Sequence, residues 1–161
     1  MIRLNRLTDY AVVVLTQMGR DLDRVHTTAR LAEDSAVPLP TVSKLMKQLA
    51  RAGLVTSRRG AAGGYVLSRP AAEISVAEVI TALEGPIALT ACVDGAADHC
   101  DVESLCAMRG NWNRVNRAIE TALASVTLAD MTVAPADMFA LPETAPAVRK
   151  PGRRCTSNSS Y

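Results

Sequence analysis

The chain has 161 residues, of which 48% are hydrophobic and only 3% aromatic, and its net charge is +2. This length suits one domain of ordinary size, or a small domain with an extension. No segment approaches the ~18 consecutive apolar residues of a membrane span, and the first residues lack the apolar stretch of a secretory signal. We therefore expect a cytoplasmic protein with no membrane partner.

The charge is distributed unevenly along the sequence. Residues 1–70 carry eleven Lys and Arg against five Asp and Glu, whereas residues 71–161 carry seven against eleven. A basic N-terminal half is typical of a nucleic-acid-binding domain that is joined to a second module. Taken alone, however, a chance imbalance on a soluble protein is the more common explanation.

Three helices are predicted in the basic half. Thr8 is expected to cap a helix over residues 9–20, and Thr28 is expected to cap a short second helix. Pro40 fits the first turn of a third helix, which stops at Gly53. A short helix, a turn and a further helix in this order predict a helix-turn-helix.

The third helix carries two distinct faces. One face is apolar at helical spacing and consists of Val42, Leu45, Met46 and Leu49. Another face has no acid and is rich in hydrogen-bond donors: Thr41, Ser43, Lys44, Lys47, Gln48 and Arg51. Such a face is expected in the major groove of DNA, although a solvated surface is the more common fate of a charged helical stripe.

A β-hairpin is predicted directly after the third helix. Two short strands, LVTS and YVLS, flank a basic, glycine-rich turn. The candidate DNA-binding residues of this hairpin are Arg58, Arg59, Gly60, Gly63, Gly64 and Tyr65. The arginines would contact phosphates or a narrow minor groove, and the glycines would allow unusual backbone angles and a close approach to phosphates. An ordinary hairpin with solvated arginines is the alternative, but the order of the elements favours a winged helix-turn-helix.

The second half is predicted to contain a loop between two helices. Ser75 and Glu78 form a capping box for the first of them, which ends at Gly85. The second begins at Asn111 and carries an apolar seam that suits packing against another helix: Trp112, Val115, Ile119, Ala122 and Val126. We expect this seam to form a homodimer, and packing against the chain's own domain is the alternative.

These elements divide the chain into four segments. They are a winged helix-turn-helix domain (1–85), a cysteine-containing loop (86–110), a dimerisation helix (111–132) and a tail (133–161). The tail has four prolines and weak periodicity, so we expect it to be disordered. The expected fold class is mainly α with a small β-hairpin.

Three cysteines stand close together in the loop. Cys92, Cys100 and Cys106 are spaced C-x7-C-x5-C. Thiolates bind zinc, copper(I) and iron–sulfur clusters, and these spacings are wider than those of common zinc sites. An iron–sulfur cluster is the first interpretation, with zinc and a thiol-redox switch as alternatives. Three thiolates leave a cluster one ligand short, and His99, a loop carboxylate or a group from a partner subunit could supply it.

The whole pattern resembles the bacterial winged-helix regulators of the IscR and NsrR type, and most of all the regulators of SUF-system iron–sulfur assembly. The resemblance covers about residues 1–132 and lies in LNRLTDYAVVVLTQM, LARAGLV, RRGAAGGYVLSRP, ISVAEVITALEG, the cysteine loop and VTLADM. It implies a homodimer that binds a [2Fe-2S] or [4Fe-4S] cluster through Cys92, Cys100 and Cys106. It also implies that the state of the cluster tunes the affinity for a two-fold double-stranded DNA operator.

The chain departs from this family pattern at two points. The first cysteine interval is x7, where many relatives have x5, and Arg109 stands where the cluster-assembly members have a ligating His. The nitric-oxide-sensing members use an Asp from the first helix of the partner subunit, and the matching residue is Asp9. The resemblance thus implies Asp9 as the fourth ligand, with His99 second, although a carboxylate in a first turn would equally stabilise its own helix.

The expected function follows from the DNA-binding pattern and the cysteine loop together. We expect a transcriptional regulator, acting as a repressor and not as an enzyme, that senses cluster status, redox or nitric oxide and controls iron–sulfur assembly genes. A zinc-binding or metal-free thiol-redox regulator with the same winged helix is the alternative.

Overall fold

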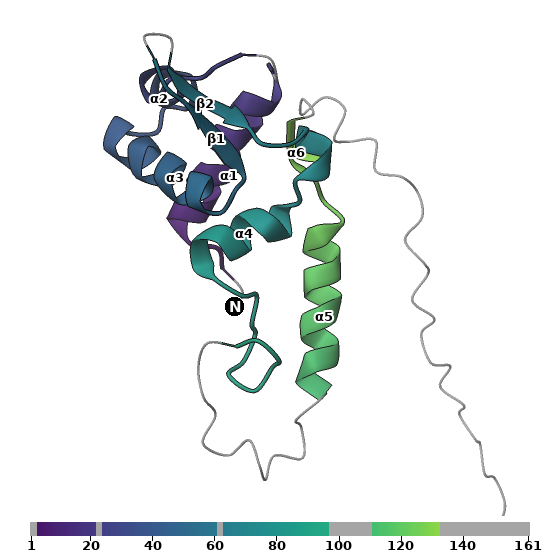
Figure 1. Cartoon of the computed structure of the whole chain (residues 1–161). Coiled ribbons are helices and arrows are strands. Elements are labelled where there is room, and N and C mark those ends of the chain that lie inside the picture. Colours follow the sequence, from purple (N-terminus) through teal and green to yellow (C-terminus); the bar gives the residue numbers. More distant parts are fainter. Residues whose placement is uncertain (1–2, 22–23, 61–62, 97–110, 133–161) are drawn as a thin grey trace, which may run out of the picture.

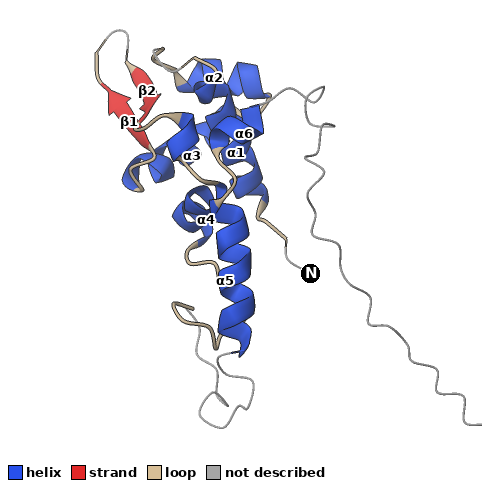
Figure 2. Cartoon of the chain, turned by 90° about the vertical axis from the view of Figure 1, so that its right-hand side faces the viewer, coloured by secondary structure: helices blue, strands red, loops and turns tan. Residues whose placement is uncertain are grey.

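The computed structural model describes residues 3–21, 24–60, 63–96 and 111–132. The elements in these ranges are α1 (Arg6–Gly19), α2 (Thr28–Ser35), α3 (Leu39–Arg51), β1 (Val55–Arg58), β2 (Gly64–Leu67), the 3-10 turn η1 (Ala71–Glu73), α4 (Val76–Glu84), α5 (Asn111–Ala124) and α6 (Leu128–Thr132). The predicted fold class, mainly α with a small antiparallel hairpin, is confirmed (Figure 2).

The start of α1 differs from the prediction. The helix is capped by Asn5, whose side-chain oxygen accepts a hydrogen bond from the backbone N–H two residues later. Thr8, the expected cap, is fully buried within the helix, and its hydroxyl donates to the carboxylate of Glu84. A capping oxygen and a buried hydroxyl look alike in sequence, because both belong to small polar residues near a helix start.

The other helix boundaries lie at or near the predicted residues. α2 is capped by Thr27 and not by Thr28, and the Thr27 hydroxyl accepts from a backbone N–H at 3.2 Å. α3 ends just before Gly53, whose φ of 75° belongs to the left-handed region that favours glycine. The capping box of Ser75 and Glu78 at the start of α4 is confirmed.

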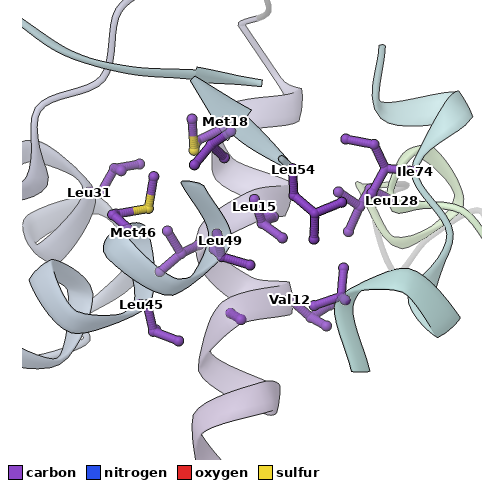
Figure 3. Close-up of a cluster of buried hydrophobic side chains, with 14 of the residues drawn as sticks. Val12, Leu15, Met18, Leu31, Leu45, Met46, Leu49, Leu54, Ile74 and Leu128 are labelled. Carbon is purple, nitrogen blue, oxygen red and sulfur yellow. The ribbon is translucent and has the colours of Figure 1, made fainter. Parts of the chain in front are cut away.

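The hydrophobic core lies among α1, α3 and the elements that pack beside them (Figure 3). The apolar stripe predicted for α3 is buried in full. The largest fully buried side chains of the whole core are Leu15, Met18, Leu31, Leu45, Met46, Leu49, Ile74 and Leu128. These side chains come from α1, α2, α3, α6 and a residue between η1 and α4. The core therefore holds α3 against these elements and leaves the polar face of α3 on the outside.

The hairpin is joined by a third extended segment that precedes α2. β1 and β2 pair antiparallel from Val55–Leu67 to Arg58–Gly64. His26 then bridges Tyr65 on the other side of β2, with N···O distances of 2.9 and 2.8 Å between their backbones. Tyr65 is next to Gly64, which belongs to the last pair before the turn, so this bridge holds the turn end of the hairpin to the segment before α2.

The chain leaves and re-enters the winged-helix domain at neighbouring points. The N–H of Val76 donates to the carbonyl of Val126, and the N–H of Leu128 donates to the carbonyl of Ile74, each at 2.9 Å. α6 then packs on α1 and η1 and buries Leu128 completely. The segment 111–132 is therefore two helices, of which α5 extends away from the domain while α6 lies on it (Figure 1).

Within the described ranges, no helix is both long and apolar enough to cross a membrane.

Candidate functional site

The polar face of α3 forms a shallow groove on the outside of the domain. The groove has a volume of about 300 Å³ and is lined by Pro40, Ser43, Lys44, Lys47, Gln48 and Arg51. Five of the six residues predicted for the DNA-facing side of this helix therefore lie together, and the lining has three cations and no acid. Thr41 lies on the same helix and is half-buried.

The wing carries Arg58, at the end of β1, and Arg59 and Gly60 at its tip, and all three are exposed. Gly60 has a φ of 118°, which agrees with the prediction that the turn needs unusual backbone angles. β1, the strand that ends at Arg58, packs against α3 (Figure 2), so the exposed cations of the wing and of α3 belong to neighbouring elements.

The other two glycines of the wing have a structural reason that the sequence did not reveal. A Cβ at Gly64 would lie 2.5 Å from the carbonyl oxygen of His26, and one at Gly63 would lie 2.8 Å from that of Arg58. At both positions the neighbouring backbone of the protein itself therefore leaves no room for a side chain. Tyr65 is half-buried and packs against the core beside the His26 bridge.

Cys92 lies on an arm, residues 85–96, that follows α4, forms turns around Cys92 and is hydrogen-bonded to α5. Its thiol is half-buried and lies 3.2 Å from the hydroxyl of Thr90. Two side chains of α5, Asn113 and Asn116, hydrogen-bond to this arm on either side of Cys92. Cys92 is therefore partly exposed on a segment that is hydrogen-bonded to α5 on both sides of it.

The remaining predicted cluster ligands of the loop, Cys100, Cys106 and His99, lie outside the described residues. Among the residues that are described, no three His, Cys, Asp or Glu side chains gather as a metal site. The donor chemistry of the loop still fits a cluster, because three thiols occur in one short stretch and the described one is a free thiol. The ligand set itself stays a prediction.

Asp9 is exposed in the first turn of α1. It lines an open recess of about 680 Å³ with Arg3, Leu4, Asn5, Arg6 and Glu84. In the described part of the chain its carboxylate makes no hydrogen bond or ion pair, whereas Glu84 beside it is engaged by Asn5 and Thr8. Asp9 thus offers an exposed carboxylate in the first turn of α1.

Sequence reasoning missed three residues of this region: Glu84, Asn113 and Asn116. Each joins segments that are far apart in sequence, over 76 residues in the case of Thr8 and Glu84. The signal for the asparagines was their i, i+3 spacing in NWNRVN, which places them on one side of a helix otherwise read for its apolar seam.

Residues 4–134 match the family model described as "Rrf2: Iron-dependent Transcriptional regulator". The chain belongs to the Rrf2 family. The match covers the winged helix, the arm, α5 and α6, so it includes both candidate regions. The expectation of an IscR- and NsrR-type regulator, and not an enzyme, is confirmed by this membership and by the relatives below.

Relatives of this Rrf2 chain are named as transcriptional regulators. It is 30% identical to the regulator NsrR of Oceanobacillus iheyensis over 86% of this chain and 95% of that protein. It is 38% identical to a candidate HTH-type regulator of Neisseria meningitidis over 61% of this chain, and the match spans only 65% of that protein's length.

Solved Rrf2-type structures share the fold. CymR of B. subtilis, titled a global cysteine regulator, has 27% identity and a TM-score of 0.64, with coverage of 82% of this chain and 97% of CymR. IscR of T. potens has 28% identity and a TM-score of 0.59, with coverage of 86% and 96%. This Rrf2 chain is therefore similar in fold both to CymR and to IscR.

Proposed function

We propose that this chain is a DNA-binding transcriptional repressor that senses an iron–sulfur cluster held by Cys92, Cys100 and Cys106, and that it controls iron–sulfur assembly genes. The observation that carries the DNA-binding part is the acid-free groove of α3, together with the two exposed arginines of the wing. The cluster part is supported by the three-cysteine loop and by a family description that names iron.

In this proposal α3 enters the major groove of the operator. Lys44, Lys47 and Arg51 are exposed and would contact phosphates or guanine edges, and the side chains of Thr41, Ser43 and Gln48 would contact bases. Arg58 and Arg59 would reach phosphates or the neighbouring minor groove from the wing. Gly60, Gly63, Gly64 and Tyr65 would act by holding the wing in shape.

We also propose that two copies meet along α5. The helix has a single buried residue among its fourteen, and Trp112 and Val115 are 38% and 44% exposed. Apolar side chains of the seam that the described part of the chain leaves exposed favour a partner helix. A two-fold dimer would present two copies of α3 to a two-fold operator.

The cluster would be held by the three thiolates together with Asp9 of the partner subunit, or with His99 as the weaker alternative. When bound, such a cluster supplies sensitivity to oxidants and to iron supply. The chain's own residues then do two things: the arm holds Cys92 in place, and the free carboxylate of Asp9 is available at the end of α1. Ligation by Asp9 would link the loop of one subunit to α1 of the other.

A second candidate function is thiol-based regulation without a cluster. The similarity to CymR, titled a global cysteine regulator, favours it because that protein matches this chain at least as well in fold as IscR does. In this case two loop cysteines would form a reversible disulfide, or the thiols would bind zinc.

Anaerobic purification distinguishes these candidates. A cluster sensor should show an iron–sulfur absorption band with stoichiometric iron and sulfide, and Cys100→Ala should remove both. Stoichiometric zinc, or a metal-free protein whose DNA affinity follows reversible thiol oxidation, would rule out the cluster.

DNA binding is tested separately by a salt-controlled mobility shift with Arg59→Ala. The variant should lose affinity and reduce the salt slope by about one unit, because an exposed wing arginine contributes to binding and little to packing. Arg117→Ala, which removes an exposed cation from α5, is the matched control. Equal binding by the two variants would contradict the wing contact.

A further inference from the structure

Asn116 of α5 hydrogen-bonds to the backbone of the arm that carries Cys92. The side chain is only 3% exposed. Its oxygen accepts from the N–H of Leu89 at 3.0 Å, and its nitrogen donates to the carbonyl of Ile87 at 2.7 Å. One side chain thus satisfies a donor and an acceptor of the arm, as a neighbouring β-strand would.

Asn113 makes a second two-point contact on the other side of the thiol. Its oxygen accepts from the N–H of Asp94, and its nitrogen donates to the Asp94 carboxylate, both at 2.9 Å. Asn113 and Asn116 are three residues apart and therefore lie on neighbouring positions of one helix face. The four hydrogen bonds bracket Cys92 between residues 89 and 94.

The arm is therefore attached to the same helix that carries the apolar seam. Trp112 and Val115 are next to the two asparagines in sequence but remain exposed, so α5 presents one side to the arm and another to solvent. A displacement of Cys92 must either break hydrogen bonds to α5 or move α5 with it.

We propose that Asn113 and Asn116 are positioning residues that fix Cys92 against α5 and couple ligation at Cys92 to the position of that helix. The inference rests on the proposed function for what Cys92 binds. A purely structural role, in which a buried amide only satisfies backbone groups, would leave the reactivity of the thiol and the response to its ligand unchanged.

The first test needs no bound metal. In the full-length chain with Cys100, Cys106 and Cys155 replaced by alanine, Cys92 is the single thiol. Asn116→Ala and Asn113→Ala should each raise its rate of alkylation by iodoacetamide roughly tenfold, because each variant removes two hydrogen bonds that close the arm. Hydrogen exchange at the Leu89 and Asp94 amides should accelerate in parallel.

Thr121→Ala is the matched control, since among the described residues this α5 hydroxyl bonds only to a carbonyl of its own helix. Its alkylation rate should equal that of the parent chain. Asn113 is less buried than Asn116, so Asn113→Ala keeps the test decisive if Asn116→Ala fails to fold. Unchanged alkylation in Asn113→Ala would overturn the inference.

The second test examines the coupling with all four cysteines present. Both asparagine variants should lose bound iron to a chelator several-fold faster than Thr121→Ala, and should narrow the difference in DNA affinity between iron-loaded and iron-free protein. Faster alkylation with an unchanged difference in DNA affinity would refute the coupling. If the unsubstituted chain binds no iron after anaerobic reconstitution, the proposed function fails, and the alkylation result alone decides the inference.

Discussion

The hydroxyl of Thr8 donates a hydrogen bond to Oε1 of Glu84 at 2.5 Å, which joins the first turn of α1 to the last residue of α4. The same oxygen accepts from the backbone N–H of Asn5 at 2.9 Å. Because α4 leads directly into the arm with Cys92, Glu84 connects the start of the arm to the helix that carries Asp9.

Thr8→Val should therefore lower the free energy of unfolding by about 1–2 kcal/mol, because it preserves the shape of a fully buried side chain but removes the donor. Thr8→Ser, which keeps the hydroxyl, should lose less. Urea denaturation followed by circular dichroism measures both. Thr16→Val is the control, since in the described ranges its hydroxyl bonds only to a carbonyl within α1. Equal losses for Thr8→Val and Thr16→Val would contradict the link to α4.

Gly64→Ala should destabilise the wing more than Gly53→Ala. At Gly64 the new methyl would meet the backbone of His26, and backbone atoms cannot rotate away, so we expect a loss of ~1–3 kcal/mol and a weaker operator affinity. At Gly53 the space around a Cβ is open, and only the left-handed φ is unfavourable, at a cost of ~1 kcal/mol. Thermal unfolding of both variants compares them, and the reverse order would refute the close-approach explanation.

The helices and the wing could be predicted from sequence because their signals are local. The apolar stripe of α3, the capping box at Ser75 and the glycine-rich turn each lie within a few residues. The bridge from His26 to Tyr65 could not be predicted, because one isolated pair of residues leaves no periodic pattern. The packing of α6 on the winged-helix domain was missed for a similar reason. In the sequence, Leu128 cannot be distinguished from a residue of the preceding helix, and only its burial next to α1 separates the two.

Val115→Glu should convert a dimer to a monomer. Val115 is exposed on the proposed seam, and a carboxylate there would be buried without a partner at the interface. Light scattering after gel filtration should report about half the parent mass. Thr121→Glu places the same charge about 120° around α5 from Val115, away from the seam, and should leave the mass unchanged. A monomeric parent chain, or an unchanged mass for Val115→Glu, would contradict the seam.

Glu78 gives the domain a pH-dependent contribution to stability. The hydrogen bond from Arg69 at 2.6 Å, followed by those from Ser75, lowers the pKa of the Glu78 carboxyl. The stabilisation is therefore complete above the ordinary pKa of glutamate and is lost as the pH falls through the lowered value. Glu78→Gln should cost no more than about 1 kcal/mol at neutral pH, because the pair is partly exposed, and this cost should disappear once the pH has fallen below the lowered pKa of Glu78.

The control for this pH dependence is Glu33→Gln, which alters an exposed carboxylate that has no hydrogen bond within the described ranges. A constant difference between Glu78→Gln and the parent chain from neutral to acid pH would show that the ion pair and the capping box contribute no stability through ionisation.

The candidate site was predictable to different degrees in its two parts. The cationic face of α3 follows from helical spacing alone, since Lys44, Lys47 and Arg51 recur at intervals of three and four. The attachment of Cys92 to α5 depends on Asn116 meeting a backbone segment 27 residues earlier. No local rule encodes such a contact, because it arises only after α4 and α5 have packed.

The paired hydrogen bonds between residues 74–76 and 126–128 have a consequence for how the sensory region can vary. Residues 77–125 therefore form a long insertion whose two ends are hydrogen-bonded to each other. The entropy of closing such a loop grows only with the logarithm of its length, so two added residues change it by a few tenths of a kcal/mol at most. The interval between Cys92 and Cys100 can therefore lengthen or shorten during evolution while the winged helix and its sealing helix α6 keep their packing.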